Sequence, residues 1–275
     1  GPEYKAPVLN INAHCLASKT MLEAGDYLIA EVATISGDLA SVELVGLNGA
    51  KGSLVYEDGK LYLRVEGMRD PADVTWSGSV DNNWDIANTA NFLNGGSQDI
   101  FVTGDDVTFN DDAANQNVIV GSGIMPSAVI FDNYQANYTL SGSSIQGGTF
   151  TQKGAGTTTI SNTNSFTGAT IAGGNVLVSS LANTDGVDLG SLGDVNTKIT
   201  LQNGGALQTS AAITTTQKIV LGEDGGGFNV TGNTLTITNP VTGGNKPVFK
   251  KGSGILNFAS SAVNNNFGVF TVEAG

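Results

Sequence analysis

Short stretches in which apolar and polar residues alternate with a period of two run through almost the whole sequence. This alternation is typical of a β-strand with one buried face, because successive side chains of a strand point to opposite faces. Turn sequences rich in Gly, Asn and Asp separate the stretches about every 8–12 residues. We therefore predict an all-β chain, in which residues 16–24 are the best candidate for a short helix. Clear examples of the alternating stretches are residues 27–32, 60–65, 197–201 and 233–238.

The ionisable residues argue against several kinds of partner and chemistry. The 275 residues include 25 Asp and Glu but only 12 Lys and Arg, which gives a net charge of −13. Nucleic acids and anionic membranes bind through clusters of Lys and Arg, so we predict neither as a partner. Cys15 and His14 are the single Cys and the single His of the sequence. They are too few for a disulfide within the chain or a structural zinc site, and we predict no metal or other cofactor.

Charge divides the sequence into three segments. Residues 1–70 and 146–275 carry both signs, whereas residues 71–145 contain Asp but neither Lys nor Arg. The last segment is nearly neutral and rich in Gly, Thr and Asn, a composition that suits stacked strands. No run of 18 apolar residues occurs, so we predict no membrane-spanning helix. We expect any export signal or membrane contact to come from a domain outside this sequence.

An internal repeat of about 100 residues links residues 148–174 to residues 246–275. The stretch beginning at Lys153 and reading Lys-Gly-Ala-Gly returns as Lys-Gly-Ser-Gly from Lys251. Three later positions also correspond, at a slightly larger offset. They pair Phe166 with Phe267, Ile171 with Val272, and Gly174 with Gly275. We therefore expect the chain to be a segment of a longer array.

The repeat carries a family resemblance. The Lys-Gly-Ala-Gly-Thr turn from Lys153, the strand 157–160, Asn164 and the stretch 166–174 resemble the autotransporter-associated β-strand repeat of bacterial passenger domains. The sequence between the two repeat signatures follows the same succession of short strands and Gly-rich turns. Upstream, the segments 74–78 and 83–85 resemble the opening of such a module, and the segments 25–27 and 35–38 resemble the close of a preceding one.

This resemblance implies a right-handed parallel β-helix, or β-solenoid, exposed at the cell surface or secreted. Residues 1–70 would be a less regular β region that completes a preceding module. Residues 71–145 would be an acidic β segment that opens the next module, and residues 146–275 would be its parallel β-helix. At about 20–25 residues per rung, the whole chain would make about ten to twelve rungs. The closing transmembrane barrel of such proteins is not predicted from this sequence, because its aromatic-girdled alternating segments are missing.

Two groups of residues are candidates for ligand binding. Trp76 and Trp84 could stack on sugar rings if they are exposed, or they could close one end of the solenoid core. Asp105, Asp106, Asp111 and Asp112 could hold calcium through their carboxylates, or they could form a solvated acidic loop. The spacing of these four aspartates does not match an EF-hand loop or a Gly-rich nonapeptide repeat.

The sequence favours a structural or adhesive role over catalysis. Polysaccharide-cleaving β-solenoids need carboxylates that converge on one bond, and the acidic residues after position 145 lie in turn-like contexts. We therefore expect no enzyme activity, a monomer, and a protein or glycan ligand on a host or environmental surface. The alternative is a carbohydrate-binding or polysaccharide-degrading module acting through the Trp76 and Trp84 region. A tailspike-like solenoid is a third reading, and it would have to be a trimer.

Overall fold

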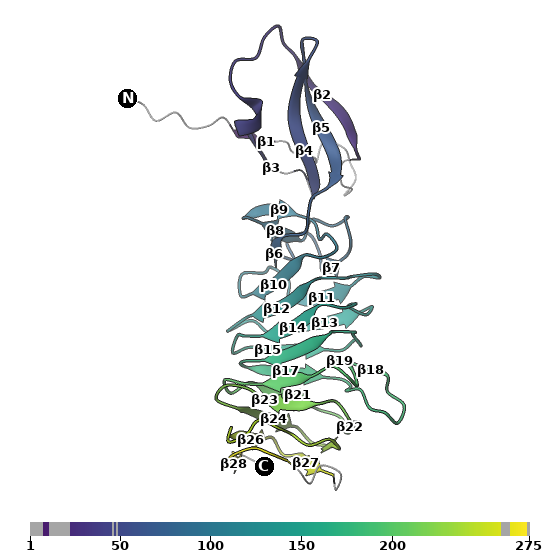
Figure 1. Ribbon diagram of the computed structural model, residues 1–275, viewed down its shortest axis with the longest axis vertical. Helices are drawn as coiled ribbons and strands as arrows, with labels where there is room; N and C mark the ends of the chain where they lie inside the picture. Colours follow the sequence, from purple (N-terminus) through teal and green to yellow (C-terminus); the bar gives the residue numbers. More distant parts are fainter. Residues whose placement is uncertain (1–7, 11–22, 46, 48, 260–264, 274–275) are drawn as a thin grey trace, which may run out of the picture.

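The computed structural model describes residues 8–10, 23–45, 47, 49–259 and 265–273. These residues form an elongated rod in which a small N-terminal sheet stands at one end of a stack of parallel coils (Figure 1). The described residues include no α-helix, and none of their helical segments could span a membrane. His14, Cys15 and most of the helix predicted over residues 16–24 lie outside the described residues.

The stacked coils form a β-solenoid whose walls are two long parallel sheets. Each turn of the chain adds one strand to each sheet, and each strand pairs with the strand one turn before it. In stacking order, sheet 1 contains β6 (Asp73–Trp76), β10 (Asp106–Asn110), β12 (Ala128–Asp132), β14 (Thr149–Gln152), β16 (Gly168–Ile171), β20 (Ile199–Leu201) and β23 (Ile219–Leu221). Sheet 2 contains β7 (Asn83–Trp84), β11 (Asn117–Val120), β13 (Tyr138–Gly142), β15 (Thr157–Ile160), β17 (Asn175–Val178), β21 (Ala206–Thr209), β24 (Gly226–Val230), β26 (Val248–Lys251) and β28 (Phe270–Val272). The prediction of a parallel β-solenoid is confirmed, and its rungs run on through residue 145 without a break.

A third wall closes the solenoid and becomes a regular sheet only near its C-terminal end. It begins as an isolated bridge between Gln146 and Ser165. It continues as sheet 3, which contains β22 (Ile213–Thr215), β25 (Thr234–Ile237) and β27 (Ile255–Phe258). Sheet 1 ends at β23, and over the last rungs isolated bridges from Val220 to Thr242 and from Thr242 to Asn266 replace its strands.

The two repeat signatures lie on different walls. The first places β14 on sheet 1 and β15 on sheet 2, whereas the second places β26 on sheet 2 and β27 on sheet 3. From β14 to β26 the chain therefore makes four complete rungs and then passes on to the next wall. These inward positions are nevertheless kept: Phe150 and Val248 are both buried, Phe166 is buried in the core, and the partly buried Phe267 packs against the core. Sequence similarity thus tracks the inward positions and not the wall that carries them.

Rung length is regular except at two insertions, the first of which separates Asp73 from its partner Asp106 by 33 residues. Paired positions along sheet 1 are 22, 21 and 19 residues apart from Asp106 to Gly168. The next rung, from Ala169 to Ile199, takes 30 residues. The additional residues include an antiparallel hairpin made of β18 (Leu189–Gly190) and β19 (Gly193–Asp194).

Glycines at the corners let successive rungs stack backbone on backbone. A Cβ atom at Gly154 would lie 1.9 Å from the carbonyl oxygen of Asn133, and one at Gly174 would lie 2.1 Å from that of Gly156. Gly174 also has a φ of 52°, which glycine adopts without the steric cost that other residues carry. The Gly positions of the repeat signature are therefore packing requirements.

The described residues between positions 8 and 70 form a structure separate from the coils. Its main sheet is antiparallel, in the order β2 (Gly25–Glu31), β5 (Lys60–Met68) and β4 (Ala50–Glu57). A parallel pair, β1 (Val8–Asn10) and β3 (Glu43–Val45), and a short 3-10 turn (Leu39–Ser41) complete it. The expectation of about ten to twelve rungs was too high, because these residues do not coil.

The core is a continuous column of inward Val, Ile, Leu and Phe side chains, and Ile199 and Leu201 belong to it, each 0% exposed. Thr200 lies between them and faces outward. We predict that Leu201→Ala costs about 2–5 kcal/mol through lost burial and a cavity, whereas Thr200→Ala stays within about 0.5 kcal/mol. Urea unfolding of both variants measures the difference. Equal losses would contradict the inward and outward assignment of this strand.

Candidate functional site

Trp76 and Trp84 lie inside the N-terminal end of the solenoid. Both are 0% exposed and pack against the rings of Phe92, Phe101 and Phe109 at centroid distances between 5.2 and 6.1 Å. Neither indole therefore offers a ring face to a sugar. The stacking role considered for this pair does not fit the structure, and the aromatic cluster instead closes the end of the core.

The strands beside the tryptophans differ from the rest of the wall. Strand β6 pairs with β10 in parallel on one side and with β8 (Phe92–Asn94) in antiparallel on the other. Strand β8 pairs in turn with β9 (Ser97–Asp99). This hairpin covers the edge of β6 that would otherwise be left without a partner.

Asp105 is a structural residue rather than a calcium ligand. Its buried carboxylate binds the Arg69 guanidinium through two contacts, Nη1 to Oδ1 at 2.6 Å and Nη2 to Oδ2 at 2.8 Å. It also accepts backbone N–H bonds from Ala72 and Val102, both at 2.8 Å. Asp99 accepts a further bond from Arg69 Nε at 2.7 Å. Burial opposes the charge of Arg69, but the contacts with these two carboxylates outweigh it and raise the pKa of Arg69.

The other three aspartates do not join Asp105 around a common ion. Asp106 begins strand β10, and Asp111 and Asp112 follow its opposite end. The Asp111 carboxylate accepts backbone N–H bonds from Ala136, Gln135 and Tyr134 of the next rung, which lower its pKa. Asp112 contacts Asn110 through its side chain and its backbone N–H. The calcium site considered for these four residues is thus not formed, and no metal-binding cluster of Asp, Glu, His or Cys occurs within the described residues.

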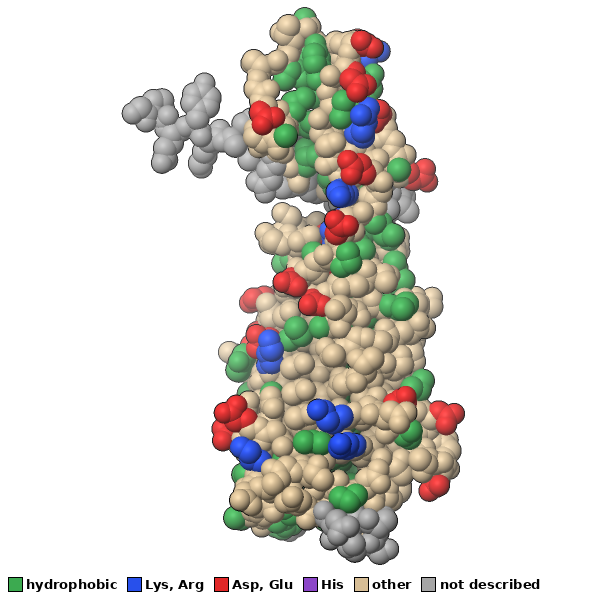
Figure 2. Space-filling model, in the orientation of Figure 1, with side chains coloured by type: hydrophobic (Ala, Val, Ile, Leu, Met, Phe, Trp, Pro, Cys, Tyr) green, Lys and Arg blue, Asp and Glu red, His purple; other side chains and the backbone are tan. Residues whose placement is uncertain are grey.

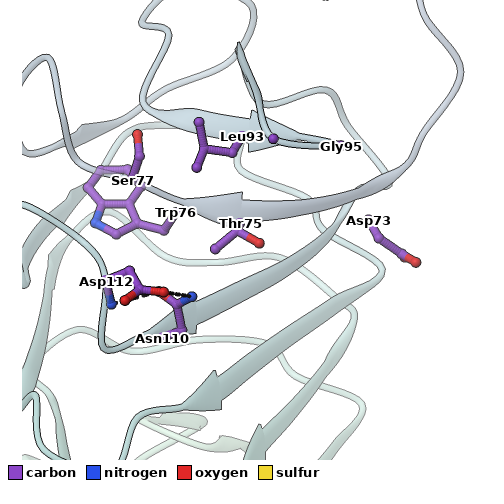
Figure 3. A pocket seen from close by; sticks show the side chains of 9 residues that line it. Asp73, Thr75, Trp76, Ser77, Leu93, Gly95, Asn110 and Asp112 are labelled. Carbon is purple, nitrogen blue, oxygen red and sulfur yellow. Dashed lines mark hydrogen bonds between the residues drawn. The ribbon is translucent and has the colours of Figure 1, made fainter.

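A shallow hollow of about 310 Å³ lies on the outer side of the same end of the solenoid. In Figure 3, Asp73 and Asp112 lie on either side of Thr75, with Asn110 below it and Leu93 above. Thr75 and Leu93 are paired across β6 and β8. The hollow offers carboxylate, amide and hydroxyl groups, which suit a hydroxyl-rich ligand or a cationic group.

The candidate residues from the sequence and the hollow lie at the same end of the solenoid. Both tryptophans and all four aspartates lie on the first two rungs, and Trp76 and Asp112 also line the hollow. Its other lining residues include Asp73 and Leu93, which were not candidates. Arg69 was also missed, because it lies 30 residues before Asp99 and 36 before Asp105. The absence of Lys and Arg from residues 71–145 was the available signal, since buried carboxylates there need a cation from outside that segment.

Comparison with protein-family models, curated proteins and solved structures found no match to this chain.

The two tryptophans provide a matched test of the end cap. Trp76 Nε1 donates to the carbonyl oxygen of Asn115 at 2.7 Å, whereas Trp84 Nε1 is buried without a hydrogen-bond partner. Each Trp→Phe change removes a similar volume, but only Trp76→Phe takes a hydrogen-bond donor away from a partly buried carbonyl. We predict that Trp76→Phe is more destabilising than Trp84→Phe by about 1 kcal/mol in urea unfolding. The reverse order would show that the Asn115 contact contributes little.

Proposed function

We propose that this chain is a non-catalytic, structural and adhesive segment of a surface-exposed bacterial passenger of the autotransporter type. The proposal rests on one observation: residues 148–174 and the described residues of 246–275, which resemble the passenger repeat, lie in parallel coils of one solenoid. A solenoid of this kind is a rigid spacer, because each rung contacts only its neighbours and the rod lengthens by about 4.8 Å per rung.

The local use of acidic residues supports a non-catalytic role. The carboxylate of Asp105 binds Arg69 and backbone N–H groups, and the carboxylate of Asp111 accepts backbone N–H bonds. Neither is therefore placed to act on a substrate. On the visible face of the solenoid the charged side chains are scattered, and most of the surface is backbone and side chains that are neither charged nor hydrophobic (Figure 2). Such a surface suits a soluble rod that meets its ligand through broad, shallow contacts.

Surface exposure is testable on intact cells of the bacterium that produces the protein. An antibody raised against residues 146–275 is expected to label unpermeabilised cells, and permeabilisation should add little signal. An antibody against a cytoplasmic protein is the control, since it should label only permeabilised cells. Labelling that appears only after permeabilisation would contradict the proposed location.

The alternative function is carbohydrate binding, and the hollow lined by Asp73, Asp112 and Asn110 is the feature that favours it. Carboxylate and amide groups beside an apolar Leu93 are groups that bind sugar hydroxyls and sugar ring faces.

A glycan array separates this alternative from the main proposal. We predict no saturable binding by the wild-type chain, and no difference between Asp112→Ala and the control Asp188→Ala, which changes an exposed residue near the β18–β19 hairpin. Saturable binding that Asp112→Ala abolishes and Asp188→Ala preserves would establish the alternative.

A further inference from the structure

The outer face of sheet 1 changes its charge along the rod. One outward position on each of its seven rungs forms a line of side chains, which we call the charged column. Two acidic residues come first, three uncharged residues follow, and two basic residues come last. In rung order the charged column is Asp73, Asp106, Ala128, Thr149, Gly168, Lys198 and Lys218.

The charged residues of this column have no counterions within the described part of the chain. Asp73, Lys198 and Lys218 are exposed and Asp106 is half-buried, and no ion pair or side-chain hydrogen bond involves any of them. Asp73 lies directly opposite Asp106 on the neighbouring strand, and Lys198 is next to Lys218 in the same way. Like charges in such positions destabilise a sheet.

The charged column is complementary to itself when its direction is reversed. Strand β14 is the fourth of the seven strands, so a two-fold axis along it exchanges the first rung with the seventh and the second with the sixth. We infer that the outer face of sheet 1 is a self-association surface that binds a second copy of this chain with its long axis reversed. Asp73 then faces Lys218 of the second copy, and Asp106 faces Lys198 of the second copy.

The remaining side chains of the face are compatible with this pairing. Ala128 faces Gly168 of the second copy, so small residues meet on either side of the axis. The neighbouring column is uncharged throughout and contains Thr75, Thr108, Ile130, Thr151, Thr170, Thr200 and Val220. In the next column Lys153 meets its own copy at the axis, and Asp132, on the adjacent strand, supplies the compensating charge.

The hollow of Figure 3 lies at the acidic end of this face. In the reversed arrangement the basic end of the second copy covers it, and the ammonium group of Lys218 enters between Asp73 and Asp112. Facing sheets lie about 10 Å apart, and two extended side chains span that distance. The hollow thus acquires a cationic occupant from the same sequence.

The area of the face indicates a weak association. Seven strands about 4.8 Å apart and four residues of about 3.3 Å each give a face of about 400 Å² per copy. Stable complexes bury about 800 Å² on each partner. We therefore expect a salt-sensitive contact that becomes strong only when many copies are held side by side. This arrangement departs from the monomer predicted from the sequence, and it does not depend on where the protein resides.

Charge reversal with complementary variants tests the inference. One variant carries Lys198→Glu and Lys218→Glu, and the other carries Asp73→Lys and Asp106→Lys. Each should lose self-association, because both ends of its column have one sign, whereas an equimolar mixture of the two should associate again. The control Asp185→Lys with Asp188→Lys makes the same charge change near the β18–β19 hairpin and should associate as the wild type does.

Sedimentation velocity at up to about 0.5 mM protein measures these outcomes, in about 0.1 M and about 0.5 M salt. The wild-type chain should show a mass that rises with concentration, and the higher salt should weaken its association at least threefold. Circular dichroism and urea midpoints identify folded variants, and Lys198→Gln with Lys218→Gln is a milder replacement if a reversal variant does not fold. The inference is overturned if the wild type stays monomeric, if the reversal variants associate as strongly as the wild type, or if their mixture does not associate.

Discussion

Backbone pairing between successive rungs is the constraint on which this structure depends. A parallel strand leaves hydrogen-bonding groups on both edges, and each rung satisfies those of the rung before it. Such a stack has no natural end, so its first rung needs a different kind of partner. Here the chain reverses direction at β8 and β9, and the antiparallel hairpin covers the exposed edge of β6.

The same end holds Asp99 and Asp105, the two carboxylates that are buried among the described residues. The tryptophan cluster fills the core beneath the hairpin, and Arg69 brings a positive charge into contact with two buried carboxylates. Removing one partner of a buried ion pair leaves an uncompensated buried charge, which destabilises a protein more than the intact pair stabilises it. Arg69 and the two carboxylates are therefore needed together. Arg69 is the residue immediately after strand β5, so its contacts with Asp99 and Asp105 also connect the N-terminal sheet to the first rungs.

Strand content and the inward or outward direction of side chains could be predicted from the sequence, because a period of two fixes both. Ile199, Thr200 and Leu201 have the predicted orientations. The partners of Asp105 could not be predicted, since they depend on which residues the rungs bring together across 30 or more positions. The exposure of Trp76 and Trp84 was undetermined for the same reason: an aromatic residue at a module boundary suits a surface site as well as an end cap. The hollow on sheet 1 also arises only from stacking.

The repeat offset of four rungs and one wall has a geometric consequence for any array built from this unit. Each copy of the signature is rotated by about a third of a turn relative to the one before, so identical sequence motifs wind around the rod as a screw. Three copies would return to the starting wall after about 13 rungs, or about 60 Å at the usual strand spacing. A receptor that binds one motif would therefore find it at long, regular intervals along any one side of the rod. Mutations confined to one copy would change the surface on only one side.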